Sequence, residues 1–282
     1  MKKKLTKLSN RSILSVSGKD SEQFLQGIVT CDIKNIRKRS SYGSILTPQG
    51  KLLYDFIISK INNNFLIDTS ESNMDSLIKL LNIYKLRSEV SLDKRDDLSV
   101  FVSMDNKKEN PNAVDPRISE LGTREILDSN NEFFNSDQDS YEKQKIKLGI
   151  AEVGSEIKSG ELFPMEANLD YLKGIDFKKG CFIGQEVTSR MYRKGKVKKR
   201  IIAFESKDTF TSNEELVYNN QTIGAVIKKI DDYGLALVKI EKIINPEREK
   251  IKITTKNNDK NVIFIFPDFL SSNKICITAC NI

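Results

Sequence analysis

The chain has 282 residues and a mass of 32.1 kDa, which is enough for two or three domains that each bury a core. It is 38% hydrophobic and 30% charged, with a formal charge of +7 and a pI near 9.0, so attraction to nucleic acid or another polyanion is permitted. No run approaches the ~20 apolar residues of a membrane helix. The basic N-terminus also lacks the ~7–15-residue apolar run of a secretory signal. We therefore expect a cytoplasmic protein without membrane contact.

The sequence contains no histidine, which excludes Ser-His-Asp and Cys-His catalysis and histidine-ligated metal. Its four cysteines are too scattered for a disulfide scaffold or for a C-x-x-C metal or redox site, so we expect thiols and no bound metal. Cys31, Cys276 and Cys280 are expected to be small buried side chains, as free cysteines usually are.

The first hundred residues predict an antiparallel sheet with helices. A strand over 12–17 precedes a helix that begins with a capping box at Asp20 and Gln23. The stretches "SYGSILTP" and "LLYDFIISKI" flank the turn "PQGK" as a hairpin, and "FLIDTS" follows as a strand. A second helix has apolar residues at i, i+3, i+4 and i+7 from Met74, and residues 89–103 form one further strand region. This pattern favours an α+β domain.

The residue pattern changes twice in the remaining chain. Residues 104–117 are polar and contain Pro111 and Pro116, which indicates an exposed loop or linker. A helix is expected over 139–149 and irregular chain over 150–186. Six short β-branched runs follow from residue 197, and a small barrel or sandwich would bury them. We therefore predict an α+β region of two interleaved subdomains over 1–196 and an all-β domain over 197–282.

The stretch "FKKGCFIGQEV", residues 177–187, places Cys181 between two glycines and among cations. Nearby cations favour the thiolate, and glycines allow a positive φ or close approach of a ligand. The basic run "RKGKVKKR", residues 193–200, follows. We interpret these lysines as a solvated face rather than as an RNA site.

The motif "FKKGCFIGQEVTSR" closely resembles the K-G-C-[YF]-x-G-Q-E signature of the YgfZ family, folate-binding relatives of the glycine-cleavage T-protein and of mitochondrial iron–sulfur assembly factors. "FLQGIVTCDI", "LTPQGKLLYDFII", "YKLRSEV" and "FPMEANLDYLKGIDFKKGC" resemble further family motifs in the family's order over residues 24–190. The C-terminal 80 or so residues match in texture only.

The resemblance implies a T-protein-like fold, with ferredoxin-like α+β units around a central folate-sized channel and a C-terminal β-barrel. It implies bound tetrahydrofolate or a one-carbon derivative, a functional thiol at Cys181 facing the folate or a delivered partner, and client iron–sulfur proteins. The motif positions that it carries over here are Lys179, Gly180, Gly184, Gln185, Glu186 and Arg190.

Folate also has chemical requirements. A pterin needs a carboxylate or amide acceptor, for which Glu166 is a candidate, with a solvated loop acid as the alternative interpretation of that residue; the glutamyl tail needs a cation, for which Arg87 and Lys145 are candidates. Many superfamily members have arginine at the position of Lys145, so a bidentate contact is replaced by a point charge. The matched motifs add Gln26, Tyr54 and Asn168 as candidate folate contacts.

One departure bears on activity. Aminomethyl-transferring T-proteins have two consecutive aspartates on the second hairpin strand, with the first implicated in catalysis, and this chain has Tyr54 and Asp55 there. Alternation sends the two side chains to opposite faces of the sheet, so Asp55 does not replace the missing carboxylate.

Three functions remain open. The leading one is a folate-dependent accessory factor for iron–sulfur cluster assembly or repair that serves enzymes such as tRNA methylthiotransferases. The second is a folate-dependent aminomethyl- or methyltransferase, and the third an RNA-binding protein that uses residues 193–200. Whether the chain turns over a substrate stays open; if it does, one-carbon transfer is the expected reaction.

Overall fold

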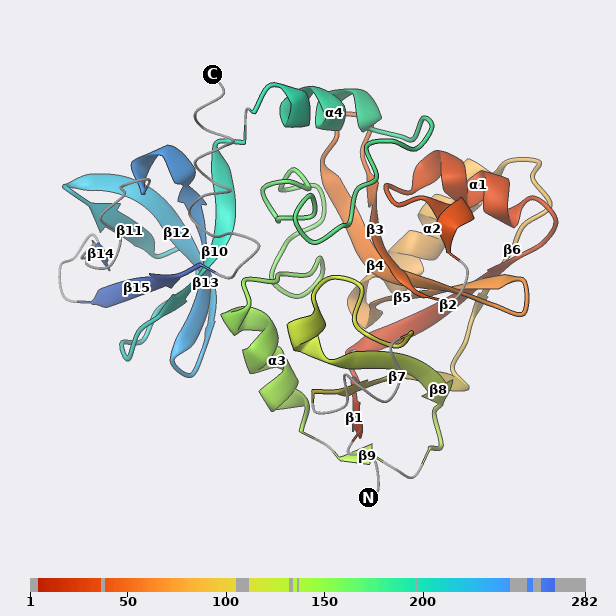
Figure 1. Ribbon diagram of the computed structural model, residues 1–282, viewed down its shortest axis with the longest axis horizontal. Helices are drawn as coiled ribbons and strands as arrows, with labels where there is room; N and C mark the ends of the chain where they lie inside the picture. The colour runs from red at the N-terminus through yellow and green to blue at the C-terminus, as the bar shows by residue number, and fades with distance from the viewer. Residues whose placement is uncertain are drawn as a thin grey trace. The chain divides into compact units, whose positions relative to one another are not determined.

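The computed structural model describes residues 5–36, 39–104, 112–131, 134–135, 137–195, 197–243, 253–255 and 260–266 (Figure 1). The chain forms two compact units. Unit 1 comprises residues 1–141, 152–161 and 172–185, and unit 2 comprises residues 142–151, 162–171 and 186–282. The sequence-based boundary between residues 196 and 197 stays a prediction.

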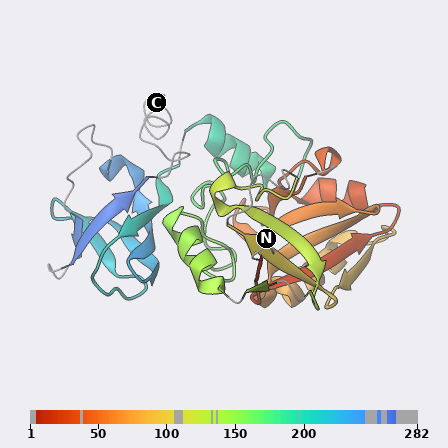
Figure 2. The same ribbon diagram turned by 60° about the horizontal axis from the view of Figure 1, so that its bottom comes forward.

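Unit 1 contains two sheets whose strands are mostly antiparallel (Figures 1 and 2). The five-stranded sheet has the order β3-β4-β5-β2-β6, and the four-stranded sheet the order β8-β7-β1-β9. The strands of the first are β2 (Arg11–Ser17), β3 (Ser41–Leu46), β4 (Leu52–Ile61), β5 (Asn64–Ser70) and β6 (Ser91–Lys94). Those of the second are β1 (Leu5–Lys7), β7 (Leu98–Ser103), β8 (Thr123–Asp128) and β9 (Phe134–Asn135).

Two helices cover one face of the five-stranded sheet. They are α1 (Ser21–Ile28) and α2 (Met74–Lys85), and short 3-10 helices lie at Ile33–Asn35, Glu71–Asn73 and Ser119–Leu121. The predicted apolar stripes are confirmed, because Phe24, Leu25 and Leu77 pack with alternate residues of the strands in one hydrophobic core. Burial of such side chains contributes about 1.5–3 kcal/mol each, which holds the helices on the sheet.

Two local expectations about unit 1, the helix cap and the exposed loop, are wrong. Asp20 makes no side-chain cap on α1, because its carboxylate accepts the backbone N–H of Glu89 at 2.8 Å instead. The strand region expected over 89–103 forms, as two strands in different sheets, because a turn at Arg95 separates β6 from β7. The exposed loop expected over 104–117 is contradicted in its described part, where Asp115 and Arg117 are buried and paired with each other. Residues 105–111 lie outside the described residues.

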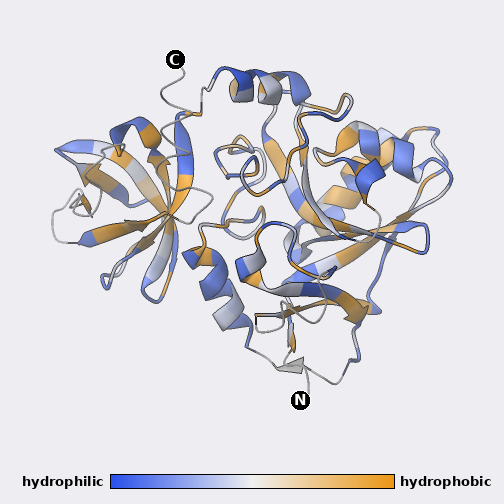
Figure 3. Cartoon of the chain, viewed as in Figure 1, coloured by the Kyte–Doolittle hydropathy of each residue, from blue (hydrophilic) through white to orange (hydrophobic). Residues whose placement is uncertain are grey.

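Unit 2 contains the expected β-domain as a closed barrel with the order β10-β13-β12-β11-β14-β15. Its strands are β10 (Lys199–Glu205), β11 (Glu215–Tyr218), β12 (Gln221–Ile230), β13 (Tyr233–Lys239), β14 (Ile253–Thr255) and β15 (Asn261–Ile265), with a 3-10 helix at Ile240–Lys242. Figure 3 shows hydrophobic stretches running through these strands. Alternate residues such as Ile202, Phe204 and Val238 fill the interior. Closure removes open strand edges, which explains why six short runs suffice.

Two further helices lie where the chain passes from one unit to the other. The helix α3 (Gln138–Lys147) matches the expectation for 139–149, and α4 (Gln185–Arg193) begins four residues after Cys181. The stretch between them is irregular, as expected. Within the described residues, no helix is both long and apolar enough to span a membrane.

Candidate functional site

The residues around Cys181 form a turn that several contacts within unit 1 fix in place. We call residues 176–184 the thiol turn. Its start is shaped by the Asp176 carboxylate, which accepts the backbone N–H groups of Lys178 at 2.8 Å and Lys179 at 3.2 Å. The backbone N–H of Asp176 donates to the Thr30 carbonyl at 2.9 Å. The turn is therefore bound to the chain segment that follows α1.

Lys179 attaches the turn from its buried side. Its ammonium Nζ donates to the backbone carbonyls of Val29 at 2.6 Å and Cys31 at 2.8 Å, and it lies 5.4 Å from the centre of the Phe182 ring.

 The contacts that anchor it are therefore the two hydrogen bonds and the aromatic ring, rather than an ion pair. Because the ammonium is buried, the pKa of Lys179 is lowered to about 8.

Gly184 attaches the other end of the turn. Its φ is +80°, and a Cβ atom there would lie 2.6 Å from the Thr47 carbonyl oxygen and 3.1 Å from the Gly50 Cα. Only glycine fits both the backbone conformation and the close approach. The predicted turn "PQGK" forms, with the Gly50 N–H donating to the Thr47 carbonyl at 2.8 Å. Two motifs that are more than a hundred residues apart in the sequence thus pack directly on each other.

Gly180 has a different role from Gly184. Its φ is not positive, and a Cβ atom placed on it would meet nothing within 4 Å. Gly180 and Cys181 are both exposed. Nothing within the described chain requires a glycine at residue 180, and the missing side chain leaves the backbone beside the thiol open to an approaching molecule.

The two described cysteines have opposite environments. Cys31 is 4% exposed, as expected, and burial raises the pKa of its thiol to about 12. Its Sγ would also lie 2.5 Å from a Cβ atom at Gly43, so it fills a space that a glycine leaves. Cys181 is exposed at the surface. Cys31 is therefore a packing group, and Cys181 is the accessible thiol. Cys276 and Cys280 lie outside the described residues.

A second polar region of unit 1 is buried, and sequence reasoning missed it. We call it the buried charge cluster. Its members share burial and direct hydrogen bonds between charged groups; they are Arg11, Asp68, Asp115, Arg117, Arg124 and Glu152, with the hydroxyl of Tyr141.

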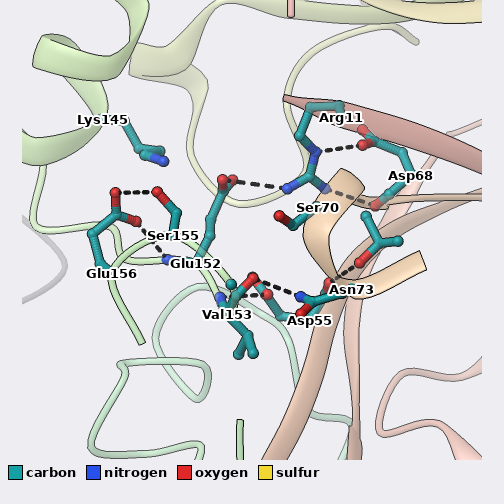
Figure 4. Close-up of polar contacts among 12 residues, drawn as sticks. Arg11, Asp55, Asp68, Ser70, Asn73, Lys145, Glu152, Val153, Ser155 and Glu156 are labelled. Carbon is teal, nitrogen blue, oxygen red and sulfur yellow. Dashed lines mark hydrogen bonds and ion pairs between the residues drawn. The ribbon is translucent and has the colours of Figure 1, made fainter. Parts of the chain in front are cut away.

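Arg11 lies at the centre of this cluster, between two carboxylates (Figure 4). Its Nε is 2.7 Å from an Asp68 oxygen and its Nη1 is 3.3 Å from a Glu152 oxygen. Asp68 also receives the Arg124 Nε at 2.6 Å. Burial alone would raise the pKa of Asp68, but the two arginines outweigh burial and lower it. The carboxylate therefore stays ionised and holds β2, β5 and β8 together.

The prediction for Tyr54 and Asp55 is confirmed. Tyr54 packs in the hydrophobic core below α1 and α2, while Asp55 points to the opposite, polar face of β4. There the Asp55 carboxylate accepts the Tyr42 hydroxyl at 2.9 Å and the Val153 N–H at 2.8 Å. Burial, and then the nearby charge of Glu152, raise the pKa of Asp55 to about 6.

The other candidate folate contacts of unit 1 differ in availability. Gln26 is occupied within the chain, since its amide donates to Asp32 at 2.9 Å and accepts the Ile33 N–H at 2.8 Å. Arg87 is exposed and lines a shallow surface groove with Asp20, Leu86 and Ser88. Of the three candidates in unit 1, Arg87 presents its charge to solvent.

Unit 2 holds the remaining three candidates. Lys145 is fully buried, with its Nζ 2.8 Å from a Glu142 carboxylate oxygen. Asn168 is buried at φ +63° and donates to the Ile201 carbonyl at 2.8 Å. Glu166 is half-buried, and its Oε2 accepts the Phe163 N–H at 2.9 Å. Lys145 and Asn168 therefore support the fold, whereas Glu166 retains carboxylate capacity for a further donor.

The last motif residues belong to α4. Gln185 starts the helix with its N–H donating to the Phe182 carbonyl at 3.1 Å, and Glu186 and Arg190 are exposed. No group of three or more histidine, cysteine, aspartate or glutamate side chains among the described residues is arranged to hold a metal ion. Cys181 can offer a soft ligand or a nucleophile.

Comparison with known proteins identifies the family. The chain is 33% identical over 238 residues to the mitochondrial iron–sulfur cluster assembly factor IBA57 homolog of Pyricularia oryzae, covering 77% of this chain and 61% of that protein. It is 26% identical to human mitochondrial IBA57, covering 85% and 78%. The chain belongs to the YgfZ family. No protein-family model matches it. This YgfZ-family chain spans about half to three fifths of the length of the fungal relatives.

A solved structure confirms the fold. The glycine-cleavage aminomethyltransferase T of Bartonella henselae matches with a TM-score of 0.72 and 12% identity, covering 96% of this chain and 88% of that one. The expected T-protein-like fold with a C-terminal barrel is therefore correct. At this identity the likeness concerns the fold alone.

The expectation of a cytoplasmic protein is wrong. The named relatives are mitochondrial, which points to the mitochondrion. The expectation rested on the missing apolar run of a secretory signal. That run is no test for mitochondrial targeting, because transit peptides are amphipathic and rich in arginine instead.

Proposed function

We propose that this YgfZ-family protein is an accessory factor for iron–sulfur cluster assembly or repair that presents the Cys181 thiol to a client protein or cluster carrier. One observation carries the proposal: the thiol is exposed, while the backbone that bears it is held at both ends. On the N-terminal side of Cys181, Lys179 donates to the carbonyls of Val29 and Cys31. On its C-terminal side, Gly184 packs on the turn at Thr47. A fixed, accessible thiol suits transfer between proteins better than a buried one.

The names of the relatives support this assignment, since both the fungal and the human protein are called iron–sulfur cluster assembly factors. The iron of iron–sulfur clusters is held by cysteine thiolates, so an accessible cysteine fits this chemistry. Client iron–sulfur proteins, including tRNA-methylthiolating enzymes, are the partners that we infer.

The decisive experiment replaces Cys181 by serine and tests rescue of cells that lack their own homologue. We expect the activity of iron–sulfur enzymes to be lost in those cells, while the melting temperature of the purified variant stays within experimental error of the parent. Full rescue by a stably folded Cys181→Ser protein would exclude the thiol mechanism. A Cys280→Ser variant, altered outside the described residues, serves as the cysteine control.

We further propose that a reduced folate binds this protein. The fold supports this proposal, and Arg87 and Glu166 are the candidates whose charged groups remain available in their respective units. The other four candidates use their polar groups inside the chain or lie in its core. Titration calorimetry with tetrahydrofolate tests the proposal, and the absence of saturable heat up to millimolar concentration would reject it.

Aminomethyl transfer has less support. Tyr54 packs in the core where the transferases have an aspartate, and both Asp55 oxygens accept hydrogen bonds within the chain. We expect negligible turnover in a reconstituted glycine-cleavage assay. Turnover comparable with a genuine T-protein would instead make the chain a transferase.

A further inference from the structure

The surface from α4 to the start of β10 in unit 2 carries exposed cations that are not neutralised. We call it the cationic strip; its charged members are Arg190, Arg193, Lys194, Lys198 and Lys199. All five are exposed, and none of them forms an ion pair with another described residue. Figure 3 shows α4 as mostly hydrophilic.

Some cations elsewhere at the surface are paired. Lys60 lies 3.0 Å from a Glu22 oxygen and Lys94 lies 3.1 Å from a Glu71 oxygen, and Lys19 pairs with Glu89. Ion pairs of this kind neutralise part of the surface charge in unit 1. Along the strip, the one acidic residue of α4, Glu186, stands four positions before Arg190 and forms no ion pair with it.

The fold accounts for only part of this charge. Cations in the last turn of a helix interact favourably with its dipole, which explains Arg190, Arg193 and Lys194. The dipole does not explain Lys199, which lies directly opposite Lys239 in the β10–β13 pairing. Like charges in that position repel each other. The accumulation of positive charge is therefore unfavourable within the chain and would be relieved by an external anion.

The strip also presents apolar contact surface. Tyr192 is 49% exposed and Met191 is half-buried, whereas Thr188 on the inner side of α4 is fully buried. Tyrosine, methionine and arginine are the side chains that are enriched at protein–protein interfaces. A nine-residue helix is about 13–14 Å long, which matches two to three turns of a partner helix.

We propose that the cationic strip is the docking surface for a carboxylate-rich segment of a protein partner. In the chain, α4 starts four residues after Cys181, so the strip follows directly on the segment that carries the thiol. The identity of the partner as a client or carrier rests on the proposed function. The charge complementarity between the strip and a carboxylate-rich segment is independent of that function.

The test uses the full chain with p-benzoylphenylalanine in place of Tyr192, expressed in cells that lack the homologue. Illumination should give a protein adduct whose cross-linked peptide is rich in aspartate and glutamate. Arg190→Glu, Arg193→Glu and Lys194→Glu together should reduce that adduct at least tenfold and abolish rescue. The matched control reverses the paired cations Lys19, Lys60 and Lys94, which changes the net charge equally and should leave adduct and rescue intact.

Two results would overturn the proposal. One is an adduct with RNA in place of protein, and the other is a protein adduct that survives reversal of the strip. A Cys181→Ser background separates this proposal from the function: it should lose rescue and keep the adduct. If Cys181→Ser rescues fully while reversal of the strip removes the adduct, the thiol function fails and the docking surface stands.

Discussion

Unit 1 contains two polar regions that differ in how their groups are used. In the buried charge cluster, arginines and carboxylates satisfy one another and are withdrawn from water. In the thiol turn, the anchoring groups are buried while Gly180 and Cys181 are open to solvent. We therefore expect changes in the buried charge cluster to alter the free energy of unfolding, and changes at the exposed thiol to alter activity. Perturbing each region should separate stability from activity.

The largest effect on stability is expected at the cluster. Arg11→Met removes the cation that Asp68 and Glu152 share, and an uncompensated buried charge costs about 3–5 kcal/mol. Chemical denaturation should show this loss of unfolding free energy. Arg95→Met is the control, because Arg95 pairs with Asp97 at the surface and should have little effect. Equal losses for both variants would contradict the structural role of the cluster.

Gly184→Ala should have the next largest effect. The methyl group meets the Thr47 carbonyl, and the positive φ disfavours any side chain, so we expect a loss of about 1–3 kcal/mol. The displaced turn should also impair rescue. Gly180→Ala is the matched control for stability, because its Cβ would enter open space. If Gly180→Ala folds normally but fails in rescue, a partner approaches the backbone at residue 180. Equal melting temperatures for Gly184→Ala and Gly180→Ala would show that the packing of Gly184 does not contribute to stability.

The pH dependence of stability should reveal Asp55. Its pKa of about 6 in the folded chain exceeds its ordinary value, so the folded state binds more protons than the unfolded state between about pH 4 and 6. This group therefore makes stability fall as the pH rises through that window, by no more than about 1.4 kcal/mol per pH unit. Urea unfolding of the parent and of Asp55→Asn at pH 4.5 and 6.5 measures the difference. An unchanged pH slope in the variant would show that Asp55 titrates normally.

Cys181→Ser should have the smallest effect on stability and a large one on function. An exposed thiol loses little packing when it becomes a hydroxyl, so we expect the unfolding free energy to change by less than about 0.5 kcal/mol. If the thiol were a packing group, the loss would reach about 1–3 kcal/mol. A denaturation curve recorded beside the rescue assay distinguishes these cases.

Much of the fold was predictable from the sequence because apolar periodicity acts locally. Alternation in residues 12–17 and the spacing that starts at Met74 gave β2 and α2, and the short runs after residue 197 gave the barrel strands. The motif around Cys181 directed attention to the accessible thiol. The opposite orientations of Tyr54 and Asp55 followed from strand alternation alone.

The tertiary structure alone decided which polar residues are buried. Arg11, Asp68 and Glu152 are separated by 57 and 84 positions, and nothing in their neighbourhoods marks them as partners. Charged residues are expected at the surface unless a partner compensates them, and such a partner is visible only when distant segments meet. Likewise, Lys179 donates hydrogen bonds to backbone carbonyls. Because every residue has a backbone carbonyl, the sequence does not indicate which residues Lys179 anchors. Residue identity determined the available chemistry, and long-range packing determined which groups are enclosed and which are exposed.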